Sequence, residues 1–421
     1  MLALSDPTLL RNAPFIDGHW RDASAAGTMD VRNPATGAIV RSVVKGSRED
    51  TKAAIDAADT AFAAWSRMPA KERSTLLRRW YELVVDNVDD LARILTAEQG
   101  KPLAEARGEV LFGAAFFEWY AEEAKRVYGE TIPAPNPDQR LIVLRQPIGV
   151  CAAITPWNFP MAMIPRKAAP ALAVGCTMVL KPASATPLSA LALAELADRA
   201  GIPAGVFNVV PGAAASVGDE LVTNPKVRKV TFTGSTAVGS ELMAKSAGDI
   251  KKVSLELGGN APLLVFDDAN LPTAVTGAIA TKFRNMGQTC VCANRVYVQA
   301  GIYDQFVERF AEAAKALRVG NGFDDGIEQG PLIDENAVLK VEEHLQDAVG
   351  LGGKIVAGGQ RHQLGGTFFQ PTVVANANAK MRVAREETFG PLAPVFRFET
   401  EDEALAYANQ TEFGLAAYVF T

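Results

Sequence analysis

Two residues of this chain combine a reactive side chain with a loop-like setting. Cys290 lies in FRNMGQTCVCANR, a polar segment with a glycine that leads into the apolar run Arg295–Val298. A buried, inert cysteine is the commoner situation, but the neighbouring Arg284 favours a reactive thiol because positive surroundings lower a thiol pKa. Glu256, in SLELGGN, interrupts an apolar run before paired glycines. Its carboxylate fits either a catalytic base or a simple turn cap.

Histidine is too scarce to supply the usual catalytic or metal-binding groups. The chain has three histidines, His19, His344 and His362, and they lie far apart in polar segments. A Ser-His-Asp triad, a Cys-His dyad or a histidine zinc site needs positioned imidazoles. The sequence therefore predicts no metal site and a carboxylate as the catalytic base.

Two further segments are candidates for nucleotide binding. FTGSTAVG at Phe232–Gly239 resembles a glycine-rich turn between a strand and a helix, although Thr236 replaces the second glycine of the usual pattern. Lys181 ends the strand-like MVLK, where the carboxyl end of a parallel strand would offer a ligand crevice. Taken singly, a tight turn and a solvated lysine are the simpler interpretations.

The elements that must position these residues alternate in type. Residues 50–126 have helical periodicity, and residues 128–147 are rich in proline and contain the strand-like RLIVLRQ, which indicates an arm. From Val150 onward, strands alternate with helices, and a second alternation follows Gly258. This pattern predicts an α/β protein with two parallel-sheet domains and a boundary near residues 257–259.

Composition excludes several classes of protein. The 421 residues are 48% hydrophobic and 21% charged with a net charge of −6, which is typical of globular proteins and not of nucleic-acid binding. Four cysteines are too few for a disulfide framework. The N-terminus lacks a secretory pattern, and the most apolar stretch, residues 168–180, is too short for a membrane span. We expect a cytoplasmic protein.

Taken together, the motifs resemble the aldehyde dehydrogenase family from about Pro14 to the end of the chain. FTGSTAVG, LELGGN, FRNMGQTC and EETFGP occur in the family's order, with PWNFP at Pro156–Pro160 and KPAS at Lys181–Ser184 also in place. The phrases around Cys290 and Glu256 are most similar to those of bacterial succinate-semialdehyde dehydrogenases.

The resemblance implies a domain plan built on two Rossmann-like parallel-sheet domains with a β-arm. Residues 1–127 and 148–257 would form the NAD(P)-binding domain, residues 128–147 the oligomerisation arm, and residues 258–421 the catalytic domain. That last domain looks incomplete, because family members usually continue further and the chain stops after the strand-like run Ala416–Phe420. With a complete C-terminus, the resemblance implies a homodimer or homotetramer.

The resemblance also assigns roles to individual residues. Cys290 would be the nucleophile, Asn158 with the Cys290 backbone N–H would hold the oxyanion, and Glu256 would activate the water that hydrolyses a thioester. Arg166 and Arg284 match positions where succinate-semialdehyde dehydrogenases place arginines toward the substrate carboxylate. The implied cofactor-binding residues are Thr155, Trp157, Lys181, Ser184, Gly212, Gly234, Ser235, Leu257, Glu387 and Phe389.

Ser184 bears on which cofactor is used. Many NAD-specific relatives have glutamate at this position, which repels a 2′-phosphate, whereas serine can donate a hydrogen bond to it. We therefore expect NADP to be preferred, with NAD possible. The alternative is that Ser184 caps the next helix.

The expected reaction is NAD(P)-dependent oxidation of an aldehyde to an acid, with succinate semialdehyde as the substrate. Glutarate semialdehyde, a non-redox thiol acyltransferase or esterase activity, and an inactive binding protein are the alternatives. Oxidation joining Cys290 to Cys292 is a further hypothesis, and it requires a bent loop.

Overall fold

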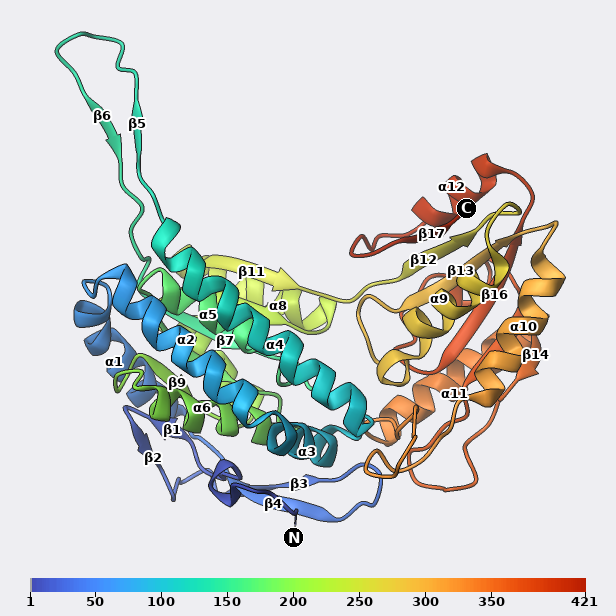
Figure 1. Cartoon of the computed structure of the whole chain (residues 1–421), viewed down its shortest axis with the longest axis horizontal. Coiled ribbons are helices and arrows are strands. Elements are labelled where there is room, and N and C mark those ends of the chain that lie inside the picture. Colours follow the sequence, from blue (N-terminus) through green and yellow to red (C-terminus); the bar gives the residue numbers. More distant parts are fainter. Residues whose placement is uncertain (1) are drawn as a thin grey trace. The chain divides into compact units, whose positions relative to one another are not determined.

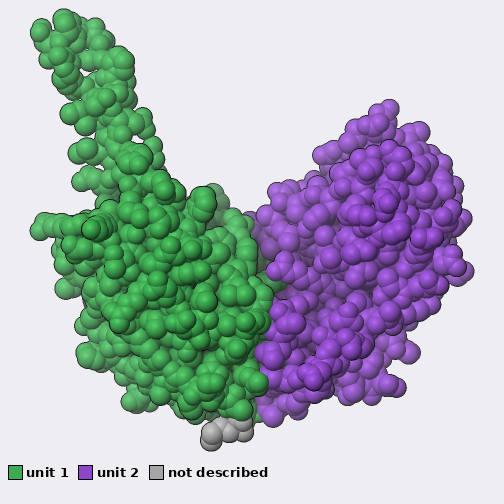
Figure 2. All heavy atoms as spheres, in the orientation of Figure 1, with its two compact units in different colours: residues 1–32, 39–98, 106–256 green, residues 33–38, 99–105, 257–421 purple. Residues whose placement is uncertain are grey.

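The computed structural model describes residues 2–421, which divide into two compact units (Figure 2). Unit 1 contains the chain before Asn33 together with Ile39–Glu98 and Ala106–Glu256. Unit 2 contains Asn33–Ala38, Gln99–Glu105 and Leu257–Thr421. The chain therefore passes between the units several times.

The predicted helical segment is confirmed. It contains α1 (Arg48–Trp65), α2 (Ala70–Asp86), α3 (Val88–Gln99) and α4 (Leu103–Glu123), followed by a 3₁₀ turn at Ala124–Arg126. Helix α1 begins with a capping box, because Ser47 accepts the Asp50 N–H and the Asp50 carboxylate accepts the Ser47 N–H. Helix α2 buries Leu77, Trp80 and Val84 at helical spacing.

A seven-stranded sheet forms the centre of unit 1, in the order β11-β10-β7-β8-β9-β1-β2. The first five strands are parallel, as predicted, and the short strands β1 and β2 add an antiparallel edge. The strands are β1 (Phe15–Ile16), β2 (His19–Trp20), β7 (Val150–Ile154), β8 (Thr177–Lys181), β9 (Phe207–Val209), β10 (Val227–Thr233) and β11 (Lys252–Glu256). The connecting helices are α5 (Pro165–Ala173), α6 (Leu188–Ala200), α7 (Asp219–Thr223) and α8 (Thr236–Ser246).

The strand register brings the ends of four parallel strands to one edge of this sheet. Thr233 is paired with Glu256, and Ile154 with Lys181. Since ligands of open α/β sheets bind beyond the carboxyl ends of the strands, this edge is where a cofactor site is expected.

Unit 2 has a six-stranded sheet in the order β14-β15-β16-β13-β12-β17, parallel except for edge strand β14. One face packs against Phe306 and Phe310, and another buried cluster contains Val341 and Leu345. The strands are β12 (Ala261–Val265), β13 (Ala293–Gln299), β14 (Lys354–Ala357), β15 (Thr372–Ala377), β16 (Leu392–Phe398) and β17 (Tyr418–Phe420). The helices are α9 (Leu271–Phe283), α10 (Tyr303–Ala316), α11 (Glu335–Gly350) and α12 (Glu401–Asn409).

Two hairpins lie outside the main sheets. One pairs β3 (Thr28–Arg32) with β4 (Ile39–Val44). The other, β5 (Glu130–Ile132) with β6 (Leu141–Val143), projects from unit 1 (Figure 1). The strand expected over RLIVLRQ is shorter than that seven-residue run, because its partner strand ends before Pro133, which has no N–H to donate. Within residues 2–421, none of the helices combines the length and apolar character needed to cross a membrane.

Candidate active site

The FTGS turn joins β10 to α8 in unit 1, as predicted. Ser235 is the N-cap of α8, and its hydroxyl accepts the Val238 N–H at 3.4 Å. The Gly234 N–H donates to the Glu256 carbonyl at 3.0 Å. A side chain at Gly234 would place its Cβ 2.4 Å from the tip of the Phe232 ring, so the ring would have to move to admit it. The turn thus presents a helix N-terminus of the kind that binds phosphate.

Lys181 and Ser184 lie at the end of β8 and in the loop beyond it. The buried Lys181 ammonium donates to the Pro182 carbonyl at 3.2 Å, and burial lowers the pKa of Lys181 to about 8. The Ser184 hydroxyl donates to the Gly212 carbonyl at 3.2 Å, which joins two predicted cofactor residues. The capping alternative for Ser184 is wrong: the first N–H groups of α6 donate to Glu98 instead.

Two threonine hydroxyls at the same sheet edge have no hydrogen-bond partner among residues 2–421. Thr155 follows β7 and Thr233 ends the neighbouring strand β10, and they are 4% and 9% exposed. An unsatisfied buried hydroxyl costs about 1–3 kcal/mol, so both atoms fit an edge that binds a polar ligand such as a nicotinamide cofactor. Sequence reasoning missed Thr233, although its position directly before Gly234 was a usable signal.

The PWNFP segment forms the loop between β7 and α5. Asn158 is buried, and the Trp157 carbonyl accepts the Thr186 hydroxyl at 3.5 Å. At the end of the loop, the N–H groups of Met161 and Ala162 donate to the Glu109 carboxylate. The loop that carries the predicted oxyanion amide is therefore fixed to α4.

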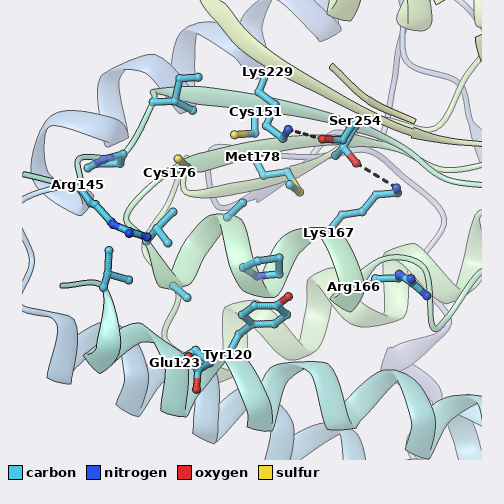
Figure 3. Close-up of a pocket in the computed structure, with 18 of the residues that line it drawn as sticks. Tyr120, Glu123, Arg145, Cys151, Arg166, Lys167, Cys176, Met178, Lys229 and Ser254 are labelled. Carbon is cyan, nitrogen blue, oxygen red and sulfur yellow. Dashed lines mark hydrogen bonds between the residues drawn. The ribbon is translucent and has the colours of Figure 1, made fainter. Parts of the chain in front are cut away.

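Arg166 and Glu256 line one cavity of about 780 Å³ within unit 1. Figure 3 shows Arg166 and Lys167 on the wall of this cavity. The Arg166 guanidinium lies over the Phe116 ring at 5.7 Å, on an exposed turn of α5. Burial lowers the pKa of the neighbouring Lys167 to about 8, while the Glu256 carboxylate opposes that change. The other charged groups of the cavity are Glu123, Arg126, Arg145 and Lys229. The cavity wall is thus predominantly cationic.

Cys290 lies in unit 2, in the loop between α9 and β13. This loop begins with a left-handed turn, because φ is 51° at Asn285, 57° at Met286 and 72° at Gly287. The Cys290 side chain is half-buried. A Cβ at Gly259 would come within 2.2 Å of the Cys290 carbonyl oxygen, so the LGGN segment packs directly against the backbone of this cysteine.

Cys292 has a different environment from Cys290. Its buried sulfur is 3.4 Å from both the Lys282 ammonium and the Lys282 carbonyl, and burial raises the pKa of the Cys292 thiol. Neither cysteine forms a disulfide. The Cys290–Cys292 switch remains a prediction, and it would require Cys292 to leave these contacts.

The remaining predicted cofactor residues lie in unit 2. Burial raises the pKa of Glu387, whose carboxylate accepts the Gly259 N–H at 3.1 Å. Phe389 has a left-handed backbone with φ of 58°. Leu257 is half-buried, and Arg284 is exposed at the end of α9. Glu387 is therefore hydrogen-bonded to the LGGN segment, and this segment also packs against the backbone of Cys290.

Comparison with known proteins identifies the family. The model of the aldehyde dehydrogenase family matches residues 20–421. The glutarate-semialdehyde dehydrogenase of Pseudomonas aeruginosa and the NADP(+) succinate-semialdehyde dehydrogenase GabD of Escherichia coli are each 61% identical over 419 residues, covering 100% of this chain and 87% of the relative. The crystal structure of an NADP-dependent enzyme from E. coli has a TM-score of 0.99 and 61% identity, with the same coverage.

The chain therefore belongs to the aldehyde dehydrogenase family, and it is an enzyme that oxidises aldehydes. The predicted family and the predicted fold class are both confirmed.

Proposed function

We propose that this enzyme oxidises succinate semialdehyde to succinate with NADP, and that Cys290, Glu256 and Asn158 carry the chemistry. The observation behind the proposal is that all three stand in family motifs, each fixed by local packing, within a family match that spans residues 20–421. In this proposal unit 1 binds the cofactor, and unit 2 supplies the nucleophile.

The first step is covalent. The Cys290 thiolate attacks the aldehyde carbon, a C–S bond forms, and the carbonyl electron pair moves to oxygen. The Asn158 amide and the Cys290 backbone N–H hold the resulting oxyanion. When bound, NADP would supply the acceptor for the hydride of this adduct, and the acyl group would then be held as a thioester on Cys290.

The second step is hydrolysis. Glu256 takes a proton from water, the hydroxide adds to the thioester carbon, and the C–S bond breaks to release the acid and the Cys290 thiolate. The Glu256 carboxylate ends β11 and lines the predominantly cationic cavity of unit 1.

The residues at the sheet edge of unit 1 fit the cofactor. Thr155 and Thr233 offer buried hydroxyls, Gly234 and Ser235 a helix N-terminus, and Lys181 a cation. Trp157, Gly212, Leu257, Glu387 and Phe389 are proposed contacts on the basis of the family motifs. NADP is preferred because Ser184 places no carboxylate against a 2′-phosphate; NAD remains usable. In the Ser184→Glu variant, the ratio of kcat/KM for NADP to that for NAD is expected to reverse.

The substrate assignment depends on a terminal anion. Two of the relatives are named for aldehydes that carry a carboxylate, succinate and glutarate semialdehyde. A guanidinium binds a carboxylate through paired hydrogen bonds, and Arg166 lines the cationic cavity of unit 1. We propose that Arg166 and Arg284 bind this carboxylate. Glutarate semialdehyde is the second candidate, because it differs by a single methylene.

A homo-oligomer joined through the β5–β6 arm is also part of the proposal. The arm exposes Ile132, Leu141, Ile142 and Leu144, which an isolated hairpin cannot bury. A homodimer or homotetramer would cover these side chains. Sedimentation of the chain with and without residues 130–143 tests this: loss of the oligomer is expected, and an unchanged mass would contradict it.

The experiment that tests the function is an absorbance assay of NADPH formation. The expected result is a higher kcat/KM for succinate semialdehyde than for butyraldehyde, which has the same chain length without the carboxylate. Equal values would overturn the substrate assignment. Thioester hydrolysis with no NADPH formed from any aldehyde would instead favour the non-redox thiol enzyme.

A further inference from the structure

One short segment supplies a carboxylate to each of three loops that carry predicted site residues. This segment, residues 98–109, leaves α3, passes through unit 2 and re-enters unit 1 in α4. Glu105 and Glu109 accept backbone N–H groups from two different loops, and Glu98 accepts those of the first residues of α6, which follow the cofactor loop. We propose that these three glutamates are positioning residues, one each for the cofactor loop, the nucleophile loop and the oxyanion loop; this rests on the proposed function.

Glu109 holds the oxyanion loop. Its Oε1 accepts the Met161 N–H at 2.9 Å and the Ala162 N–H at 3.1 Å, and the side chain is 1% exposed. One helical turn further on, a Cβ at Gly113 would come within 3.0 Å of the Ala162 backbone, so α4 packs tightly against the loop. These contacts fix the backbone just after Asn158, whose amide must point at the developing oxyanion.

Glu105 holds the nucleophile loop within unit 2. Its carboxylate accepts the Asn285 N–H at 3.0 Å, and Gln99 donates to the Asn285 side-chain oxygen at 3.1 Å. Asn285 and Met286 are both left-handed, a conformation that costs about 1–3 kcal/mol for each residue other than glycine. Glu105 and Gln99 thus stabilise a strained turn that sets the direction of the chain toward Cys290.

Glu98 holds the start of α6, directly after the KPAS segment. One carboxylate oxygen accepts the Leu188 N–H at 2.7 Å and the other the Ser189 N–H at 2.8 Å, and the side chain is fully buried. The Ser189 hydroxyl also donates to Glu98. The loop that contains Lys181 and Ser184 is therefore anchored at its far end.

Glu98 and Glu109 differ in how many of their carboxylate oxygens accept backbone N–H groups, so replacement by glutamine should affect them differently. Glu109 receives the Met161 and Ala162 N–H groups on one oxygen, so the side-chain carbonyl oxygen of glutamine can still accept both. Glu98 uses both oxygens, so glutamine would direct an NH₂ group at a backbone N–H. We therefore expect Glu109→Gln to lower kcat less than Glu109→Leu does, and Glu98→Gln to weaken NADP binding, although both glutamates undergo the same chemical change.

The test measures three properties of each variant: kcat with succinate semialdehyde, the Kd for NADP by calorimetry, and the rate at which iodoacetamide alkylates Cys290. Glu109→Leu should lower kcat about 10- to 100-fold, with the Kd and the alkylation rate unchanged. Glu105→Leu should change the alkylation rate as well as kcat, again with an unchanged Kd. Glu98→Gln should weaken NADP binding without affecting alkylation.

Two controls make the result interpretable. Glu118→Leu removes an exposed glutamate of α4 that pairs with Arg78, and it should resemble the wild type in all three measurements. Cys290→Ala identifies the alkylation that belongs to Cys290. The proposal is overturned if the three variants behave like Glu118→Leu, or if each of them lowers kcat, raises the Kd and changes the alkylation rate together. A wild-type chain that forms no NADPH contradicts the proposed function instead, while NADP binding and alkylation still test the positioning of the loops.

Discussion

Cys290 and Glu256 divide the proposed reaction into two chemical steps that can be separated by mutation. Cys290→Ala should abolish NADPH formation while NADP still binds, because the residue touches only the aldehyde. Glu256→Gln should retain one rapid turnover of NADPH and then slow about 100-fold or more, because the thioester loses its general base. Rapid-mixing absorbance measures both phases. An unaltered steady-state rate for Glu256→Gln at neutral pH would remove Glu256 from the mechanism.

Lys181 makes NADP binding dependent on pH in a defined direction. Burial lowers the pKa of Lys181 to about 8, so its ammonium is charged below this pH and neutral above it. The Kd for NADP should therefore be constant below pH 8 and increase above it, while the 2′-phosphate stays fully ionised. Calorimetry from pH 7 to pH 9.5 measures this. The Lys181→Met variant should bind NADP weakly, with a Kd that depends little on pH. If its Kd shows the same increase above pH 8, another group is responsible for the titration.

Candidate site residues could be proposed where the chemistry is confined to a short motif. Cys290, Glu256 and Gly234 are proposed from their residue types and from the glycines in their motifs, and the structure shows that a Cβ at Gly259 would collide with the Cys290 carbonyl oxygen. Glu105 and Glu109 gave no such signal. Their partners, Asn285 and Met161, lie 180 and 52 residues away, and these bonds come from backbone N–H groups, which every residue type except proline provides.

At the scale of elements, periodicity predicted the alternation of strands and helices because each element buries a regular set of apolar side chains. The sequence pattern predicts a strand over Val150–Ile154 and a helix over Pro272–Lys282. Strand β7 has those bounds, and α9 (Leu271–Phe283) begins one residue earlier and ends one residue later. The left-handed turn at Asn285 and Met286 could not be predicted, because neither residue is glycine and the conformation depends on bonds from the distant residues Glu105 and Gln99.

That turn also makes Gly287 critical for the nucleophile loop. Its φ is 72°, and a Cβ there would meet the Gly390 carbonyl oxygen at 2.2 Å. Gly287→Ala should destabilise the protein by about 1–3 kcal/mol or more and reduce the alkylation of Cys290. Chemical denaturation measures the loss. Gly248→Ala, where no neighbouring heavy atom lies within 4 Å, is the matched control and should change little. Equal stability of the two variants would mean that the loop relaxes without cost.

At the scale of the whole molecule, the path of the chain between the units has a consequence for unfolding. The β3–β4 hairpin has its strands in unit 1 and its connecting residues 33–38 in unit 2, and residues 99–105 interrupt unit 1 in the same way. Neither unit is a continuous stretch of chain, so one cannot unfold without displacing segments that belong to the other. We expect one cooperative transition, in contrast to the separate transitions of domains joined by a simple linker.

NADP tests this expectation, because its proposed contacts lie mainly in unit 1. A ligand that binds only the native state increases the free energy of unfolding by about 2.7 kcal/mol at a concentration of 100 times its Kd. If unfolding is cooperative, NADP should raise the temperature of the single unfolding transition. The increase should be larger than with an equal concentration of NAD, because we propose that NADP binds more tightly than NAD. Scanning calorimetry of the Cys290→Ala variant measures the transition temperature. This variant is expected to bind the cofactor without turnover, so the cofactor is not consumed during the measurement. Two transitions, of which NADP raises only one, would show that the units unfold independently despite the shared segments.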